Sequence, residues 1–321
     1  MAEPVSPRRA ALRVFAPVAA RLGGAIFVLW AVASITFFAV RLIPGDPAQA
    51  VLGGPGSQAS PEALAAVRTE YGFDKPVLVQ YLAQLGRLAT GDLGRSYALN
   101  QDVGPLVLDQ LGGTVLLAVL ALALAWLLAL ALAAWSTRGG TVAARVGSGL
   151  EIVAAALPHF WLATSLIVVF SIWLGVLPPI STVGAAGLVL PVLTLAIPLA
   201  GFLGQILRES LLAALESPFV LSARARGESE RGVLWTHALR HASLPAISLS
   251  GWAFGSLISG AVVVETIFAR PGLGRTLLTA VTLRDVPVVI GVVMIVAVAY
   301  ILMTLLTDAA TRLVDPRLRS E

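Results

Sequence analysis

The chain has 321 residues, of which 57% are hydrophobic and only 12% charged, whereas soluble domains carry about 25% charged residues. This composition excludes an ordinary soluble domain and indicates a protein that spans a lipid bilayer. The absence of cysteine excludes disulfides and thiolate chemistry, and the net charge of +4 is interpreted as membrane topology rather than as nucleic-acid binding.

The beginning of the chain predicts a cytoplasmic leader followed by one membrane helix. Residues 1–21 are basic and contain prolines, and the apolar run 22–40 follows them and ends at Arg41. The sequence L-I-P-G-D-P-A comes next, and its two prolines prevent the helix from continuing. The first membrane helix is therefore expected to end at Arg41.

The segment 43–110 is a long polar interruption between the first two apolar runs. A capping serine, a proline and a glycine predict one helix over residues 60–72, and the spacing of apolar residues predicts another over 75–89. The segment is neither low in complexity nor highly charged, so we expect it to be ordered. Residues 22–110 are thus predicted to form the first membrane helix and a partly helical extracytoplasmic insert.

Five further apolar runs are long enough to cross a bilayer, which takes about 20 residues in a helix. The predicted spans are 111–135, 150–174, 188–207, 244–268 and 286–307. Residues 136–149 are expected to be a loop. The sequence therefore predicts an all-α membrane protein with six transmembrane helices, in which residues 111–312 form a five-helix core and residues 313–321 a cytoplasmic tail.

Six spans place both ends of the chain on the same side of the membrane. Assigning the ends to the cytoplasm puts most lysines and arginines inside, which is the side that membrane proteins prefer for them. We therefore expect a multi-pass protein of the cytoplasmic (inner) membrane with both termini in the cytoplasm.

The stretch 216–245 is a polar island between two apolar runs. Ser217 and Pro218 are typical of a helix start, in which the serine side chain caps the helix and the proline takes its first position. Gly227 is expected to end that helix in the left-handed conformation. A serine caps a second predicted helix, 229–244, and the proline after it is expected to open the next span. This pattern predicts a helical docking loop, 208–243, in the cytoplasm.

The order of small residues, glycine and leucine in this loop resembles the EAA loop of permease subunits in binding-protein-dependent ABC importers. The matching residues are Ser222, Ala223, Gly227 and Leu239. The residues that depart from the general pattern are Leu221, His237 and Arg240. These departures are typical of the B-type permeases of the dipeptide, oligopeptide, glutathione and nickel group. The stretches 42–48, 90–96 and 260–275 resemble the same group.

This resemblance implies the type I ABC importer fold, also called MetI-like, and a non-catalytic permease subunit forming half of a pathway for peptides or related small solutes. It implies three kinds of protein partner: a second homologous permease, two ATPase subunits that bind ATP and Mg, and an extracytoplasmic substrate-binding protein. The lipid bilayer surrounds the permease. The ATPases would drive alternating access through the loop 208–243, called the coupling loop below. The residues implied in coupling are Ser217, Ser222, Ala223, Arg224, Arg226, Gly227, Glu228, His237 and Leu239.

The sequence offers no ATP, metal or catalytic site of its own. A phosphate-binding loop needs G-K-[ST], and the single lysine, Lys75, is followed by Pro76. His237 and His241 are spaced like zinc ligands, but no carboxylate stands at a matching position and the chain has no cysteine. The nucleophile pattern G-x-S-x-G is also missing. No cofactor is therefore expected on this chain.

Three residues are candidates for the gate or the pathway, namely Pro158, His159 and Glu265. His159 follows the proline that interrupts a span, and it either packs in the bundle, bonded to a freed backbone carbonyl, or lines the pathway. Glu265 either pairs with Arg270 or Arg275 at the membrane surface or lies at the outer gate, where it contacts a partner protein.

An ion-coupled secondary transporter is the alternative function. Such carriers usually need an ionisable group near the middle of the bilayer, whereas Glu151, Glu209, Glu265 and Asp308 fall near predicted span ends. The sequence also shows no evident inverted repeat. The substrate stays open among dipeptides, oligopeptides, glutathione, nickel chelates and haem-like cargoes, because the resemblance implies that selectivity resides mainly in the binding protein.

Overall fold

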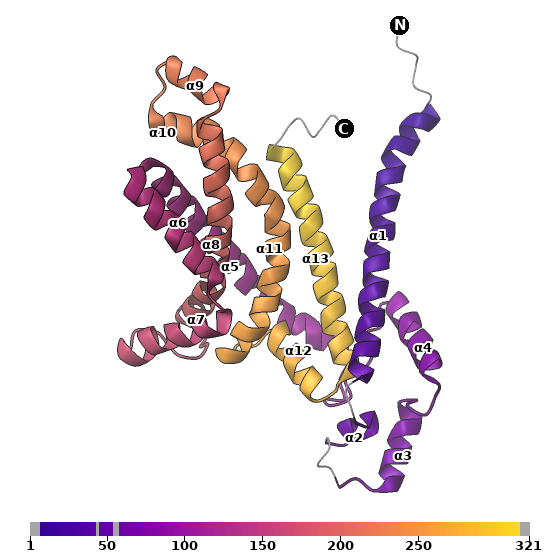
Figure 1. Cartoon of the computed structure of the whole chain (residues 1–321). Helices are drawn as coiled ribbons and strands as arrows, with labels where there is room; N and C mark the ends of the chain where they lie inside the picture. Colours follow the sequence, from indigo (N-terminus) through magenta and orange to yellow (C-terminus); the bar gives the residue numbers. More distant parts are fainter. Residues whose placement is uncertain (1–6, 43–44, 54–57, 315–321) are drawn as a thin grey trace. The chain divides into compact units, whose positions relative to one another are not determined.

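The computed structural model describes residues 7–42, 45–53 and 58–314 (Figure 1). These parts of the chain are helical, apart from turns, loops and an isolated β-bridge between Arg95 and Asp102. The predicted all-α fold class is therefore confirmed. Of the predicted leader and tail, residues 1–6 and 315–321 lie outside the described parts, as do residues 43–44 of the proline-containing stretch.

The chain contains thirteen α-helices in the described residues, with π-helical stretches at two places. Those of the first half are α1 (Pro7–Arg41), α2 (Pro47–Val51), α3 (Pro61–Glu70), α4 (Val77–Ala89), α5 (Val103–Arg138), α6 (Gly140–Ala156) and α7 (His159–Leu166). Those of the second half are α8 (Ala186–Leu215), α9 (Pro218–Ala225), α10 (Glu230–Gly232), α11 (Leu239–Ile267), α12 (Leu273–Thr282) and α13 (Val286–Val314). The π-helical stretches are Ile167–Trp173 after α7 and Val233–Ala238 before α11.

Five helices are long and apolar enough to cross a membrane, and the bent pair α6–α7 adds a sixth span when it is counted as one. This number agrees with the six predicted spans. The helices run past the predicted ends, because α1 begins within the predicted leader at Pro7 and α5 begins within the predicted insert at Val103. Apolar residues mark the part of a helix that lies in lipid, so hydrophobicity alone underestimates helix length.

The third span differs most from its prediction. The predicted loop 136–149 is almost entirely helical, because Gly140 adopts a left-handed φ of 75° and turns the chain directly from α5 into α6. The span then breaks at Leu157 and Pro158, both of which are extended, and α6 and α7 enclose a bend of 103°. The proline accounts for the break, since it disfavours the helical conformation of the residue before it.

The chain forms two compact units, the first made of residues 1–108 with 279–301 and the second of 109–278 with 302–321. In the first unit both predicted insert helices are confirmed as α3 and α4. The hydroxyl of Ser60 accepts a hydrogen bond from the N–H of Ala63 at 3.2 Å and caps α3. The short helix α2 was not predicted from the sequence.

The stretch 90–96, one of those that carry the family resemblance, leads into a loop that is fixed to Asp285. The Ser96 hydroxyl donates to the Asp285 carboxylate at 2.5 Å, and the N–H groups of Tyr97 and Ala98 donate to it at 3.1 Å. Asp285 is only 2% exposed, so these three donors satisfy a buried charge. The loop is therefore held against the residue that precedes α13.

The second unit is organised around α8, against which α6, α7 and α11 pack (Figure 1). Gly201 permits the closest approach, since a Cβ there would lie 2.5 Å from the backbone nitrogen of Ala155 and 2.6 Å from the carbonyl oxygen of Glu151. Pro191 and Pro198 lie inside α8 without ending it. The well-packed α8 leads directly into the coupling loop.

Candidate functional site

The predicted start of the coupling loop lies inside a helix, because α8 continues through residue 208 and ends at Leu215. Ser217 has extended backbone angles and precedes Pro218 at the first helical position, so the predicted start of α9 is confirmed. The predicted role of the Ser217 hydroxyl is wrong, because it makes no cap hydrogen bond to α9 and instead donates to the carbonyl of Ala214 at 2.5 Å. A serine hydroxyl can bond back to the preceding turn, and here it closes the end of α8.

Gly227 ends the first loop helix as predicted, with a left-handed φ of 83°. The N–H of Gly227 donates to the carbonyl of Arg224 at 2.9 Å, and the N–H of Glu228 donates to that of Ala223 at 3.2 Å. This pair of bonds is the Schellman arrangement, in which a left-handed residue satisfies the last helical carbonyls. A residue without a Cβ fits this position best.

Charged side chains bridge the turn at Gly227. The Arg224 guanidinium donates two hydrogen bonds of 3.0 Å to the Glu230 carboxylate, one to each oxygen. On the other side of the turn, Nε2 of His237 lies 2.8 Å from the Glu228 carboxylate. Because these groups are partly solvent-exposed, each pair contributes little to stability. Arg224 links α9 to α10, and Glu228 links the turn to the π-helical stretch.

A small apolar core lies beneath these ion pairs. Its buried members are Leu211, Ala214, Val220, Ala223, Val233, Leu234, Ala238 and Ala242. Ala223 is fully buried in this core, whereas its neighbour Ser222 is exposed. The first small residue of the predicted pair therefore faces solvent and the second packs α9 onto the rest of the coupling loop.

Four large apolar side chains of the loop remain outside this core. Leu212 is 41% exposed, Phe219 39%, Leu221 57% and Trp235 56%. Phe219 also lies against the ring of His241, with a centroid distance of 4.7 Å. A rigid loop that exposes apolar side chains has the character of a protein-binding surface.

The second loop helix does not end at Leu244. α10, the π-helical stretch and α11 form one continuous helical span from Glu230 to Ile267, with Pro245 inside it. The prediction that Pro245 opens a new span is therefore wrong. A proline inside a helix removes one backbone hydrogen bond, and the adjoining π-helical turns give this helix an irregular bonding pattern already. The coupling loop is thus continuous with both α8 and α11.

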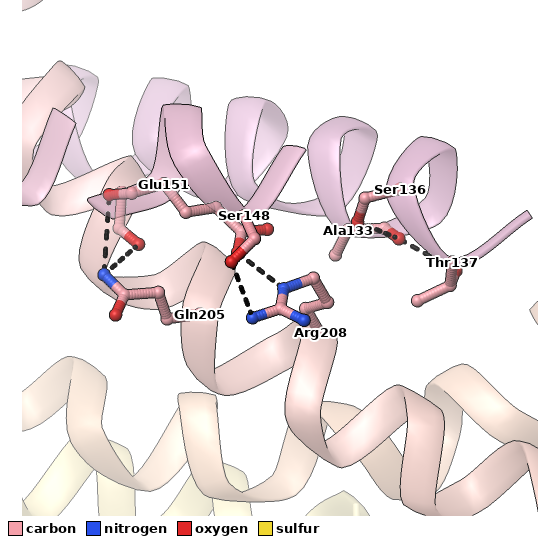
Figure 2. A network of polar contacts seen from close by, with 8 residues as sticks. Ala133, Ser136, Thr137, Ser148, Glu151, Gln205 and Arg208 are labelled. Carbon is pink, nitrogen blue, oxygen red and sulfur yellow. Dashed lines mark hydrogen bonds and ion pairs between the residues drawn. The ribbon is translucent and has the colours of Figure 1, made fainter. Parts of the chain in front are cut away.

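An ion pair joins α6 to α8 at the first residue of the coupling loop (Figure 2), with the Glu151 side chain fully buried and that of Arg208 21% exposed. Nε of Arg208 donates to a carboxylate oxygen of Glu151 at 2.7 Å, and the same guanidinium reaches the hydroxyl of Ser148 at 3.3 Å. Gln205 on α8 donates to the carbonyl oxygen of Glu151 at 3.4 Å. Glu151 is fully buried, and its second carboxylate oxygen has no partner among the described residues.

This pair was not found from the sequence. Glu151 was predicted to lie near the end of the span 150–174, where a charge can reach water. α6 begins at Gly140, ten residues before that predicted span, and carries Glu151 into the helix bundle. The sequence did contain a clue to this pair, since Arg208 carries the opposite charge and stands at the end of another apolar run. Removing Arg208 would leave the fully buried carboxylate of Glu151 without a compensating charge, whereas removing Glu151 would leave a guanidinium that is 21% exposed.

The gate candidates Pro158 and His159 lie at the bend between α6 and α7. The His159 ring is partly buried against α11, because a Cβ on Gly260 would lie 3.2 Å from its Nε2 atom. Within the described residues His159 makes no hydrogen bond. The expected bond to a freed backbone carbonyl is therefore wrong, and the observed contact is packing.

His159→Asn should retain at least about half of wild-type uptake, because the replaced ring makes only packing contacts. His159→Leu, which fills the same space without a polar group, should behave in the same way. Uptake measured at equal amounts of assembled complex checks both variants. Loss of uptake in both, with ATP hydrolysis intact, would instead make His159 a pathway residue.

Glu265 is the third gate candidate, and it is fully buried. The Thr114 hydroxyl donates to its carboxylate at 2.5 Å, and the N–H groups of Gly274 and Arg275 donate at 2.7 and 3.1 Å. The expected pairing with Arg270 or Arg275 is not found among the described residues, since the Arg275 guanidinium donates to the carbonyl of Ala269 and Nε of Arg270 has no hydrogen-bond partner there. A buried carboxylate satisfied by three donors ties α5, α11 and the start of α12 together.

Comparison with known proteins identifies one family along most of the chain. Residues 121–320 match the family described as binding-protein-dependent transport system inner membrane component, and residues 14–118 match the N-terminal family of such components. A protein of Brucella abortus (strain 2308), named for a peptide transport system permease, is 36% identical over 315 residues, covering 93% of this chain and 97% of that protein.

A glutathione transport system permease protein of Salmonella choleraesuis (strain SC-B67) is 33% identical over 303 residues, covering 93% of this chain and 97% of that protein. A chain of a solved amino acid ABC transporter superposes with a TM-score of 0.48 at 22% identity, covering 66% of this chain and 94% of that chain. The family resemblance of the coupling loop is therefore confirmed along most of the chain. The chain belongs to the binding-protein-dependent transport system inner membrane components and is a non-catalytic, multi-pass permease subunit of an ABC importer.

Proposed function

We propose that this chain forms half of a pathway for peptides, including glutathione, and pairs with a second, homologous permease. Relatives at 36% and 33% identity are named for peptide and glutathione transport, which supports this substrate class. Two ATPase subunits bind ATP and Mg and drive alternating access, and an extracytoplasmic binding protein delivers the substrate. The chain itself binds no cofactor.

The observation that supports this proposal best is the construction of the coupling loop. Its core and ion pairs make it rigid, and it is continuous with α8 and α11, which pack against each other. A force applied to Leu221 or Trp235 on its surface would therefore move two membrane helices as well as the loop. Ser217, Ser222, Arg226 and Leu239 belong to the same proposed docking element.

The bend at Pro158 is the proposed moving part of the pathway. α6 is tied to α8 through Glu151 and Arg208, whereas α7 packs on both α8 and α11. A shift of α8 relative to α11 would therefore change the angle at Pro158. His159 lies at this bend, and Glu265 holds α12 in place at the end of α11.

The proposed orientation places the coupling loop and both termini, 1–21 and 313–321, in the cytoplasm. The insert within 22–110 then faces outward, toward the binding protein, and residues 111–312 form the permease core. The chain has no cysteine, so single cysteines report on topology without background labelling.

An impermeant thiol reagent should label Thr69→Cys and Asn100→Cys in intact cells, because the insert faces outward. Ser222→Cys in the coupling loop should be labelled only after lysis. All three side chains are exposed, so access to the aqueous phase rather than burial decides the result. The reverse pattern of labelling would contradict the orientation.

Reconstitution of the complex in proteoliposomes tests the proposed function. Peptide-loaded binding protein should stimulate ATP hydrolysis and peptide uptake, and omission of the ATPase subunits should abolish both. Uptake by this permease driven by a proton or sodium gradient without ATPase subunits would instead support the alternative of a secondary transporter.

A further inference from the structure

A cavity of about 630 Å³ lies in the first unit, where the end of α1 meets the insert. Four of the side chains that line it are cationic, namely Arg41, Lys75, Arg87 and Arg284. Glu70 is the single carboxylate among the lining residues. The cavity therefore carries an excess of positive charge.

These cations are not neutralised within the described residues. Arg41 lies over the Phe37 ring, 4.5 Å from its centroid, and donates to the side chain of Gln80. Arg87 donates to the side-chain oxygen of Gln84 at 2.7 Å. None of the four cations forms an ion pair in the described parts of the chain. Their charges remain available to an anion.

The helix α4, which forms one wall of the cavity, packs beside the apolar run of α1. The Tyr81 hydroxyl is 2.7 Å from that of Ser34, which lies seven residues, or about 10 Å, before the end of the span at Arg41. The Tyr81 ring also packs on Phe37, with a centroid distance of 5.5 Å. α4 is therefore held against the part of α1 that lies in lipid.

The outer face of α4 is apolar, as an interfacial position requires. Leu78 is 65% exposed and Leu82 is 57% exposed, and on α1 the side chains of Ile35 and Phe38 are 68% and 47% exposed. A helix that combines an apolar face with neighbouring cations is typical of the boundary between headgroups and acyl chains.

Aromatic side chains form another wall of the cavity. Tyr71, Phe73 and Tyr97 pack against one another, with centroid distances between 5.0 and 5.8 Å. The Tyr97 phenol is neutral at physiological pH and adds no negative charge, and desolvation raises its pKa further, to about 12. Tyrosines are also common at membrane interfaces.

We propose that this cavity binds the phosphate of an anionic phospholipid, whose acyl chains lie along the exposed apolar faces of α1 and α4. Arg41, Lys75 and Arg87 supply the positive charge, and basic groups beside a membrane helix are suited to such headgroups. A soluble anion would satisfy the cations, but it would leave the adjoining apolar face without a ligand. The site depends neither on the transported substrate nor on which side of the membrane the insert occupies.

Native mass spectrometry of the purified complex, titrated with dihexanoyl phosphatidylglycerol, tests this site. Lys75→Gln combined with Arg87→Gln should weaken binding at least about tenfold, because two charges beside the phosphate are lost. Lys75→Arg combined with Arg87→Lys keeps both charges and should bind like wild type. Arg95→Gln is the matched control, since it removes an exposed insert charge outside the cavity.

Three results would overturn the assignment. Equal binding of dihexanoyl phosphatidylcholine and phosphatidylglycerol would show that the negative charge is not recognised. Equal effects of Arg95→Gln and the double substitution would show that the cavity is not the site. Displacement of phosphatidylglycerol by inorganic phosphate or glutathione at the same concentration would identify a site for soluble anions. Peptide-stimulated uptake could remain normal in each case, so these results are distinct from a failure of the proposed function.

Discussion

Gly227→Val should leave the permease inserted in normal amount while ATP hydrolysis loses its stimulation by loaded binding protein. Gly227 has a φ of 83°, and a side chain in this conformation costs about 1–2 kcal/mol. No atom lies within 4 Å of the position of a Cβ, so the cost comes from the backbone rather than from a clash. This cost is small for a membrane protein, but it acts on the turn that orients α9.

The matched control is Gly232→Ala. Gly232 lies in the same loop but has a right-handed φ of −59°, and a Cβ there would make ordinary contact with the Ser229 hydroxyl at 3.4 Å. This variant should keep stimulated hydrolysis and uptake. If Gly227→Val also kept stimulated hydrolysis and uptake, the left-handed turn would have no part in coupling. If Gly227→Val instead reduced the amount of permease in the membrane, the turn would be needed for folding.

Removal of Arg208 from the Glu151–Arg208 pair should destabilise the permease far more than removal of an exposed charge in the second unit. Glu151 is fully buried, and loss of Arg208 leaves its charge without compensation, at a cost of about 3–5 kcal/mol. Arg208→Met should therefore lower the thermal stability of the purified complex strongly, and Glu151→Leu should lower it less, because the Arg208 side chain is 21% exposed. Replacement of both residues together should restore much of it, because buried ion pairs exchange well for apolar groups.

The neighbouring carboxylate supplies the control for this double-mutant cycle. Glu209 follows Arg208 in the sequence but is exposed, so Glu209→Gln should change stability little. Additive effects of the two single substitutions, with no recovery in the double variant, would contradict a direct interaction between Glu151 and Arg208.

The features that could be predicted from the sequence are those set by neighbouring residues. Ser60 caps α3 and Gly227 takes a left-handed conformation because capping and backbone freedom depend on local sequence. The apolar runs likewise indicate the spans, since a segment in lipid must form its backbone hydrogen bonds within its own helix. Pro158 breaks its span for a local reason as well.

The remaining features depend on residues far apart in the chain. Glu265 and Thr114 are hydrogen-bonded although they are 151 residues apart in the sequence, and Glu151 and Arg208 are 57 residues apart. No local sequence pattern reveals either contact. Pro245 illustrates the opposite error, because a local rule predicted a helix boundary that tertiary packing overrides.

Site-specific crosslinking from Leu221 tests most directly whether the coupling loop is the docking site of the ATPase subunits. The chain has no cysteine, and Leu221 is 57% exposed on α9, so Leu221→Cys can carry a single benzophenone. In the assembled complex this variant should crosslink to an ATPase subunit. Val183→Cys, on an exposed turn outside the loop, should not. An ATPase adduct from position 183 and none from 221 would contradict the account.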